Sequence, residues 1–266
     1  MPAKLKHIAL VSDNYALQGK FYEAAFGMRT AADPRPERAV TVGDGYVGLN
    51  INPRKPGRPA GLDHFGLEVD EVAPILERLK KHRVEVVKRP STRPFAGITT
   101  HDPAGNLFDL SQRDMQNRTS VYVESEKPAA RRISHFALRT LDAERVADFY
   151  AEVCGLQPAK GKHGNFHLTD GRVTLVLMPW RITDFEGTGI VRPGPDHIGF
   201  EVESLDAFKQ RLQELGDNNP HLRARALAGR EGEARMKLFA SSCSLGEYRI
   251  ADVDGVLLDV AEKNPR

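Results

Sequence analysis

The sequence contains nearly the same heptapeptide twice, DHFGLEV at 63–69 and DHIGFEV at 196–202, 133 positions apart. Two further pairs recur at an offset of 128: KHIAL at 6–10 with SHFAL at 134–138, and FYEAAFGM at 21–28 with FYAEVCGL at 149–156. Because several segments repeat in the same order at similar offsets, the chain consists of two homologous copies. We therefore expect two domains that share one fold.

A change of offset places an insertion in the second copy. GNLFDLS at 105–111 matches GVLLDVA at 255–261 at an offset of 150, so the second copy is about 17 residues longer. We expect a first domain at 1–115, a linker at 116–131 and a second domain at 132–266, with an inserted loop at about 217–237. The glycines and mixed charges of the insertion predict a solvated flexible loop. The alternative is a lid whose guanidinium groups reach an anionic substrate, supplied by Arg223, Arg225, Arg230 and Arg235.

Each copy divides again into two units of similar pattern. A short strand is followed by a segment with apolar residues three and four apart, and then by further strands, with tight-turn signals at Asp44-Gly45 and Asp170-Gly171. The sequence thus predicts an α+β fold with four βαβββ units. Each domain pairs two units into a curved mixed sheet that has its helices on the outer face.

Composition excludes several classes of partner. The net charge of +2 is too small to indicate nucleic acid or an anionic membrane as a partner. No apolar run approaches the ~20 residues that span a bilayer, and the N-terminal segment lacks the apolar core of a signal peptide. Only two cysteines occur, which favours a reducing compartment. We expect a cytoplasmic protein, and we expect it to form a homo-oligomer.

A histidine opens the first strand of every unit. These strands are HIAL from His7, HFGL from His64, HFAL from His135 and HIGF from His197. Residues two apart share one face of a strand, so each imidazole has only alanine or glycine beside it. A histidine buried in a core needs bulky neighbours, because protein interiors are close-packed. Small neighbours therefore predict a polar cavity on this face.

The closing strands LFDLS and LLDVA add a carboxylate to each domain, Asp109 and Asp259. Two imidazoles and one carboxylate are the ligand set that suits non-haem Fe(II), or Mn(II), and that leaves positions open for substrate and oxygen. The plain alternative is that the histidines are hydrogen-bonded core residues and that the aspartates bind backbone amides. Four equivalent histidines and two equivalent aspartates favour the metal.

Paired βαβββ units, the opening histidines and the segment HDPAGNLFDL at 101–110 resemble the vicinal oxygen chelate superfamily, and ADVDGVLLDV at 251–260 is a weaker copy of that segment. This superfamily includes glyoxalase I, methylmalonyl-CoA epimerase, fosfomycin-resistance enzymes, bleomycin-binding proteins and extradiol dioxygenases. A single chain of four units is most similar in plan to the extradiol dioxygenases. Strand by strand, the resemblance implies a metal held by His135, His197 and Asp259. The second candidate set is His7, His64 and Asp109.

The sequence departs from the extradiol pattern. Its carboxylates are aspartates where the family has glutamate, and aspartate is one methylene shorter. Tyr248 roughly matches the active-site tyrosine of these enzymes, but the spacing from Tyr248 to Asp259 is one residue too long. Phe239, Ala240 and Ser241 lie where the family has an active-site histidine. The remaining candidates for it, which we expect on the surface or in loops, are His163, His167 and His221.

The resemblance implies a metal-dependent dioxygenase that acts on a catechol-like or other vicinal-oxygen small molecule. Dioxygen would be its cosubstrate, and Tyr248 would donate a proton. Three alternatives stay open. A lyase or isomerase of the glyoxalase or epimerase type would use the first domain, with Asn50, on the same strand face as Asn52, as a further ligand. A binding protein of the bleomycin-resistance type would lack catalysis. A pairing of the first and fourth units would instead combine His7, His197 and Asp259.

Overall fold

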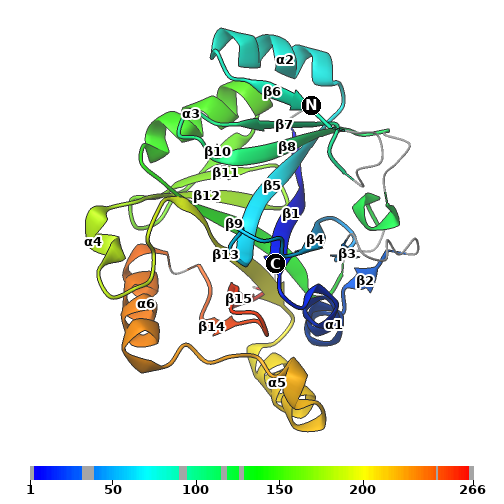
Figure 1. Ribbon diagram of the computed structural model, residues 1–266, viewed down its shortest axis with the longest axis vertical. Coiled ribbons are helices and arrows are strands. Elements are labelled where there is room, and N and C mark those ends of the chain that lie inside the picture. The colour runs from blue at the N-terminus through cyan, green and yellow to red at the C-terminus, as the bar shows by residue number, and fades with distance from the viewer. Residues whose placement is uncertain are drawn as a thin grey trace.

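The computed structural model describes residues 3–31, 39–89, 95–114, 119–125, 129–243 and 245–263, and Figure 1 shows their arrangement. The first domain contains β1 (Lys4–Ser12), α1 (Tyr15–Phe26), β2 (Arg29–Thr30), β3 (Val40–Gly43), β4 (Gly48–Pro53), β5 (Gly61–Val69), α2 (Val72–Lys81), β6 (Val86–Lys88), β7 (Ile98–His101) and β8 (Leu107–Gln112). A 3-10 helix, η1 (Ser120–Tyr122), follows in the segment that joins the domains.

The second domain repeats this order with changes in its last unit. It contains β9 (Arg132–Thr140), α3 (Ala143–Cys154), β10 (Gln157–Ala159), β11 (Phe166–Thr169), β12 (Thr174–Pro179), α4 (Ile182–Phe185), β13 (Gly194–Val202), α5 (Leu205–Asn218), η2 (Pro220–Leu222), α6 (Gly229–Ser242), β14 (Tyr248–Ala251) and β15 (Leu257–Glu262). Among the described helices, none is long and apolar enough to cross a membrane.

Each domain forms one mixed sheet around a central antiparallel pair. The strand orders are β2-β3-β4-β1-β5-β8-β7-β6 and β10-β11-β12-β9-β13-β15-β14. In the centre, β1 pairs with β5 and β9 with β13, while β4, β8, β12 and β15 add to these strands in parallel. The predicted α+β fold with paired βαβββ units is confirmed. In the described part of the last unit, α6 stands at the point in the order of elements where the first domain has β6.

The large residues of the opening strands build the core on the sheet face opposite the histidines. Phe65 lies 5.4 Å from Phe136 between ring centroids, and Phe26 of α1 stacks on Phe200 at 3.8 Å. One apolar cluster therefore includes residues of both sheets and of the helices α1, α2, α3 and α5. Helix ends follow local sequence: Asn14 accepts from the Leu17 amide at the start of α1, and Gly27 ends the helix at a φ of 71° that glycine adopts readily.

The two domains are also joined by a reciprocal pair of hydrogen bonds. Asp44, in the β3–β4 turn, accepts from the backbone N–H of Ile133 at 2.7 Å, and Asp170, in the β11–β12 turn, accepts from that of Leu5 at 2.7 Å. Both turns are the hairpins that the Asp-Gly pairs predict. Each turn therefore stabilises its own hairpin and holds the opening strand of the other domain.

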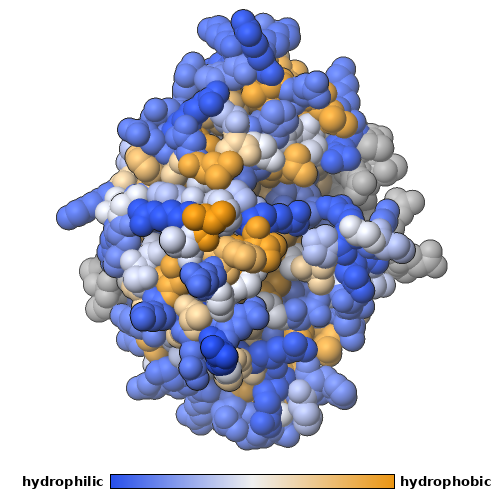
Figure 2. Space-filling view, turned by 60° about the vertical axis from the view of Figure 1, so that its left-hand side comes forward, coloured by the Kyte–Doolittle hydropathy of each residue, from blue (hydrophilic) through white to orange (hydrophobic). Residues whose placement is uncertain are grey.

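The insertion is more ordered than its composition indicates. The expected flexible loop at about 217–237 begins in α5, passes through η2 and ends in α6. The 14-residue helix α6 packs its buried Phe239 against the second sheet. Figure 2 brings the side of α4 and α6 forward and shows a mainly hydrophilic surface with small apolar groups. The prediction of a solvated loop is therefore wrong for the second half of the insertion.

Candidate metal centres

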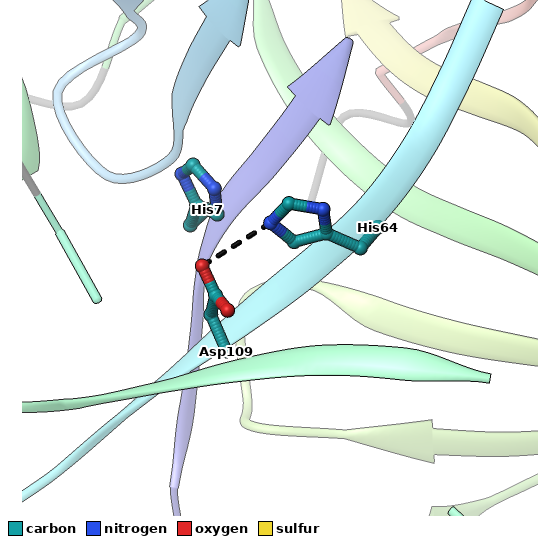
Figure 3. Close-up of side chains that lie close together, drawn as sticks. All are labelled: His7, His64 and Asp109. Atoms are coloured by element: carbon teal, nitrogen blue, oxygen red, sulfur yellow. Dashed lines mark hydrogen bonds and ion pairs between the residues drawn. The ribbon is translucent and has the colours of Figure 1, made fainter. Parts of the chain in front are cut away.

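His7, His64 and Asp109 form the N-terminal cluster, shown in Figure 3. They come from β1, β5 and β8, which are adjacent strands, and point to the same side of the sheet (Figure 3). One ligand atom from each lies within 4.8 Å of the other two, and His64 Nε2 is 3.1 Å from Asp109 Oδ2. The side chain of His64 is 17% exposed. The structure thus brings the second predicted ligand set together at a position that is partly accessible to solvent.

Neighbouring polar groups orient the ligands of the N-terminal cluster. Asp63 Oδ2 lies 2.8 Å from His64 Nδ1, and the Tyr122 hydroxyl lies 2.8 Å from His7 Nδ1. Burial alone would lower the pKa of His64, but hydrogen bonds and charge from Asp109 and Asp63 raise it to about 9. Without a metal, a proton therefore balances the two carboxylates. A bound cation would replace that proton, as ligation requires a free imidazole lone pair.

Aromatic rings fill much of the space beside the N-terminal cluster. Phe95 stacks on His7 with ring centroids 4.7 Å apart, and Tyr122 from η1 packs over Gly48. A β-carbon at Gly66 would lie 3.0 Å from the β-carbon of His7. The small residues therefore make room for rings. The prediction of a largely empty polar face is wrong here, because strand alternation does not reveal what the linker and loops place on the sheet.

His135, His197 and Asp259 form the C-terminal cluster, on β9, β13 and β15. His135 Nε2 lies 3.1 Å from His197 Nε2 and 3.5 Å from Asp259 Oδ2. A β-carbon at Gly199, which pairs with His135 across the strands, would overlap the imidazole of His135. The three side chains are 5%, 0% and 0% exposed. The first predicted ligand set is therefore also assembled, but it is fully buried.

A buried aspartate orients His197. Asp196 Oδ2 lies 2.7 Å from His197 Nδ1, and Asp196 Oδ1 accepts from Arg139 Nε at 2.7 Å and from Arg235 Nη2 at 2.6 Å. Burial opposes ionisation, but Arg235, His197 and Arg139 together hold the pKa of Asp196 far below its usual value. His197 therefore donates from Nδ1 to a carboxylate, and its Nε2 lone pair faces the cluster.

The two orienting aspartates are functional candidates that sequence reasoning missed. Asp63 and Asp196 each precede a cluster histidine in the repeated DH dipeptide, and each contacts Nδ1 of that histidine. The signal was present, because a carboxylate next to a metal-binding histidine commonly fixes its tautomer. Tyr122 was also missed, since the linker shows no apolar period that would predict a buried side chain.

Helix α6 covers the C-terminal cluster. The Phe239 ring lies 4.6 Å from the His197 ring, and Cys243 Sγ lies 3.6 Å from His197 Nε2. Phe239 occupies the part of the sequence where the family has an active-site histidine. Its apolar ring packs against the candidate ligand His197. Arg235, one of the four arginines of the insertion, pairs with Asp196 instead of facing solvent.

Both clusters have the donor chemistry of a divalent metal site. In the C-terminal cluster, Asp259 Oδ1 is buried without a hydrogen-bond donor among the described residues, and Arg249 Nε is 3.8 Å away. Burial raises the pKa of Asp259, although His197 and other neighbours oppose it. A buried carboxylate oxygen without a donor is costly, and a cation would remove that cost. The residues therefore fit a metal of the kind the sequence predicts.

Tyr248 does not reach either cluster. On β14, Tyr248 pairs with Val260, and the next residue, Arg249, pairs with Asp259. Because side chains alternate between faces, Tyr248 lies on the helix-covered side with Val260, where Lys209 approaches its ring at 5.4 Å. The additional residue of spacing noted in the sequence therefore places Tyr248 on the wrong face for a proton donor, and Arg249 takes the position beside the cluster.

The other histidine candidates are also placed. His163 and His221 are exposed, as expected, but His167 is buried on β11 and its Nε2 finds no hydrogen-bond partner among the described residues. The expectation of a surface or loop histidine is therefore wrong for His167. The pairing of the first and fourth units is not formed, because His7 and His197 belong to different clusters.

Asn50 lies on the same sheet face as His7 but has its own partners. It accepts from Thr41 Oγ1 at 3.2 Å and donates to Asn52 Oδ1 at 3.4 Å. Within the described residues, the N-terminal cluster consists of two histidines and one aspartate. The polar contacts of Asn50 match the alternative in which it does not bind metal.

The chain thus consists of two sheets of paired βαβββ units. Each sheet has one His-His-Asp cluster on three adjacent strands, and each cluster is a candidate metal site. Residues 4–110 and 132–260 match the family model of the Glyoxalase/Bleomycin resistance protein/Dioxygenase superfamily. The chain belongs to this superfamily, and the resemblance seen in the sequence is confirmed.

Similar solved structures extend over nearly the whole chain. They include the Mn(II)-bound glyoxalase from Novosphingobium aromaticivorans (13% identity, 98% of this chain and 82% of that chain, TM-score 0.64). They also include homoprotocatechuate 2,3-dioxygenase from Arthrobacter globiformis (14% identity, 98% of this chain and 80% of that chain, TM-score 0.64). A third is a mutant of 4-hydroxymandelate synthase from Streptomyces coelicolor (14% identity, 100% of this chain and 94% of that chain, TM-score 0.63). At these identities the likeness shows the fold alone. No curated protein sequence matches the chain.

Proposed function

We propose that this protein is a metal-dependent dioxygenase for a catechol-like or other small molecule with vicinal oxygens, and that substrate binds at the N-terminal cluster. The observation that carries the proposal is the difference in access between the two clusters. His64 and Asp109 keep 17% and 9% of their side chains exposed, whereas His197 and Asp259 have none exposed and lie beneath α6. A substrate must reach its metal, so we assign catalysis to the first domain.

The donor set supports a dioxygenase over a lyase or isomerase. His7, His64 and Asp109 would hold Fe(II) or Mn(II), which when bound supplies Lewis acidity and open positions for substrate oxygens and dioxygen. A lyase of the glyoxalase kind takes a further protein ligand from β4, and there the Asn50 amide is bonded to Thr41. Three protein ligands leave more positions for small molecules than four.

The surrounding residues have separable roles in this proposal. Asp63 holds the orientation of His64, and Tyr122 that of His7. Thr99 donates to Asp109 and accepts from Arg89 Nε at 2.6 Å, so it keeps the carboxylate in place and brings an exposed guanidinium near the cluster. Phe95 is buried and stacks on His7, so it fixes the plane of that imidazole. Substrate and dioxygen are the partners that this chemistry needs.

Anaerobic reconstitution with Fe(II), followed by air and a panel of catechols, tests the proposal. We expect the absorbance of a ring-cleavage product with the wild-type protein, its loss in His64→Ala, and its retention in Asn50→Ala. His197→Ala is the matched variant of the second domain and should keep the activity if it folds. A flat trace across the panel with metal bound to the N-terminal cluster excludes a ring-cleaving dioxygenase. Activity that survives His64→Ala excludes the assignment to the first domain.

A further inference from the structure

A cavity of about 370 Å³ lies between α5, α6 and the edge of the second sheet, in the lower half of Figure 1. The inserted segment from Arg223 to Leu227 forms one of its walls. We propose that this insertion cavity binds a small amphiphilic organic anion, that is, a carboxylate or sulfonate attached to an aromatic or aliphatic group. Among the described residues that line it, none is a ligand of either His-His-Asp cluster. The inference therefore goes beyond the proposed activity and does not depend on it.

The edge of the second sheet lacks the strand that closes the first. In the first domain β6 pairs with the outer side of β7, and Val87 lies opposite Thr99. The equivalent strand of the second domain is β14, where Arg249 corresponds to Thr99 at the offset of 150. Within the described ranges, β14 has a single bridge on this side, between Arg225 and Ala251. The residues of β14 that line the cavity are those beside this unpaired part of the edge, Tyr248, Arg249 and Ile250.

The unpaired edge supplies a hydrogen-bond donor to the cavity. Ala251 uses its backbone N–H and C=O for Arg225, at N···O distances of 2.9 and 2.8 Å. In an antiparallel strand every second residue has both groups on the same side, so Arg249 also directs them outward. No group in the part of the chain that the structure describes accepts from this N–H. The backbone N–H of Arg249 can therefore donate to an anionic oxygen.

The cationic side chains of the insertion cavity favour a negatively charged ligand. Arg223 is already bonded to α5, since its Nη2 lies 3.0 Å from Asp217 Oδ1. Lys209 is weakly paired, because its Nζ is 3.6 Å from Asp206, whose side chain is 97% exposed. Within the described residues, the side chain of Arg225 has neither an ion pair nor a hydrogen bond, and no Asp or Glu lines the cavity. Arg225 and Lys209 thus remain available for an anion.

The apolar part of the lining indicates that the anion carries a hydrophobic group. Leu212 of α5, Leu227 of the inserted segment and Met236 of α6 all line the cavity. Tyr248 adds an aromatic ring, and Lys209 Nζ lies 5.4 Å from the centroid of this ring. The volume is within the range of about 300–1,000 Å³ that is typical of small-molecule sites. An organic anion matches both the charge and the apolar wall, whereas an inorganic anion would leave the apolar wall uncovered.

Fluorescence titration of the full-length protein with two matched probes tests the inference. Anilinonaphthalene sulfonate is an aromatic anion, and phenylnaphthylamine has the same rings without the charge. We expect one bound sulfonate per chain, tighter binding of the sulfonate than of phenylnaphthylamine, and the same affinities with and without Mn(II). Arg225→Gln should weaken binding of the sulfonate about fivefold and leave that of phenylnaphthylamine unchanged. Arg230→Gln removes an exposed charge of the insertion outside the cavity, so it is the matched control and should change neither affinity.

A bulky side chain in the wall locates the bound probe. Ala226 is exposed and lines the cavity, so Ala226→Trp should fill it without disturbing the core and abolish binding of both probes. Ala228, also exposed, lies outside the lining, and Ala228→Trp should keep both. Equal affinity for the two probes, equal weakening by Arg225→Gln and Arg230→Gln, binding that requires Mn(II), or binding that survives Ala226→Trp overturns the inference. None of these results depends on whether the protein cleaves catechols.

Discussion

Removing the charge of Asp196 should reveal how much the buried ion pairs that contact His197 contribute to the stability of the fold and to metal binding. Asp196 is 2% exposed and contacts His197, Arg139 and Arg235, whereas its counterpart Asp63 is 21% exposed and pairs with Arg58, which is 52% exposed. Asparagine keeps the shape but not the charge. In Asp196→Asn the buried Arg139 keeps its pair with Asp184 but loses Asp196, and Arg235 loses the carboxylate it pairs with, while in Asp63→Asn the exposed Arg58 remains solvated.

The two variants should differ strongly in stability. Breaking a buried ion pair by removing one partner costs about 3–5 kcal/mol. Losing an exposed pair costs about 0–1 kcal/mol. The free energy of unfolding of the metal-free protein should thus fall by about 2 kcal/mol or more in Asp196→Asn beyond its fall in Asp63→Asn. Each variant should also weaken metal binding to its own cluster about 10- to 100-fold, because the histidine loses its orienting carboxylate.

Urea unfolding in chelator measures the stability, and competition with a metal indicator measures the affinities. Equal destabilisation by the two variants would refute the importance of the buried network. Unchanged metal affinity in both would refute the role of the DH aspartates. Asp196→Glu, which keeps the charge but lengthens the side chain by one methylene, is the conservative control and should recover part of both losses.

Contacts in the two domains lead to three further predictions. Tyr122→Phe should weaken metal binding at the N-terminal cluster by about 10- to 100-fold with little change in unfolding, as isothermal titration would show. Gly199→Ala should displace the His135 ring and abolish the C-terminal site, which metal analysis would detect as one ion fewer per chain. Partial burial opposes ionisation of Glu124, but its hydrogen bond with Lys4 lowers its pKa, so its stabilisation is present above about pH 4.5 and is lost as the pH falls. In Glu124→Gln the loss of unfolding free energy between neutral and acidic pH should therefore be smaller than in the wild type, by less than about 1 kcal/mol, which urea unfolding at several pH values would measure.

The fold could be predicted because its information is local and repeated. The duplicated segments set the number of units, and the alternation in HIAL and HFGL placed the histidines on one face. Strand adjacency then brings His7, His64 and Asp109 together, since β1, β5 and β8 are neighbours in the sheet. The same pairing holds for the second domain. Both clusters thus follow from the strand pattern and the family plan.

What could not be predicted depends on segments outside the repeats. Tyr122 and Phe95 reach the N-terminal cluster from the linker and a loop, which have no periodicity that fixes their side chains. The mixed composition of the insertion hides a helix whose stability comes from Phe239 and Arg235 contacts with the sheet. Tyr248 faces the helices because a difference of one residue in a strand reverses the face.

Anomalous diffraction from crystals grown with Mn(II) tests the central claim most directly, because it locates each ion among its ligands. We expect a peak bound by His7, His64 and Asp109 that a soaked catechol can approach. An N-terminal cluster without a peak, with manganese and catechol instead bound beneath α6, would contradict the assignment of catalysis to the first domain.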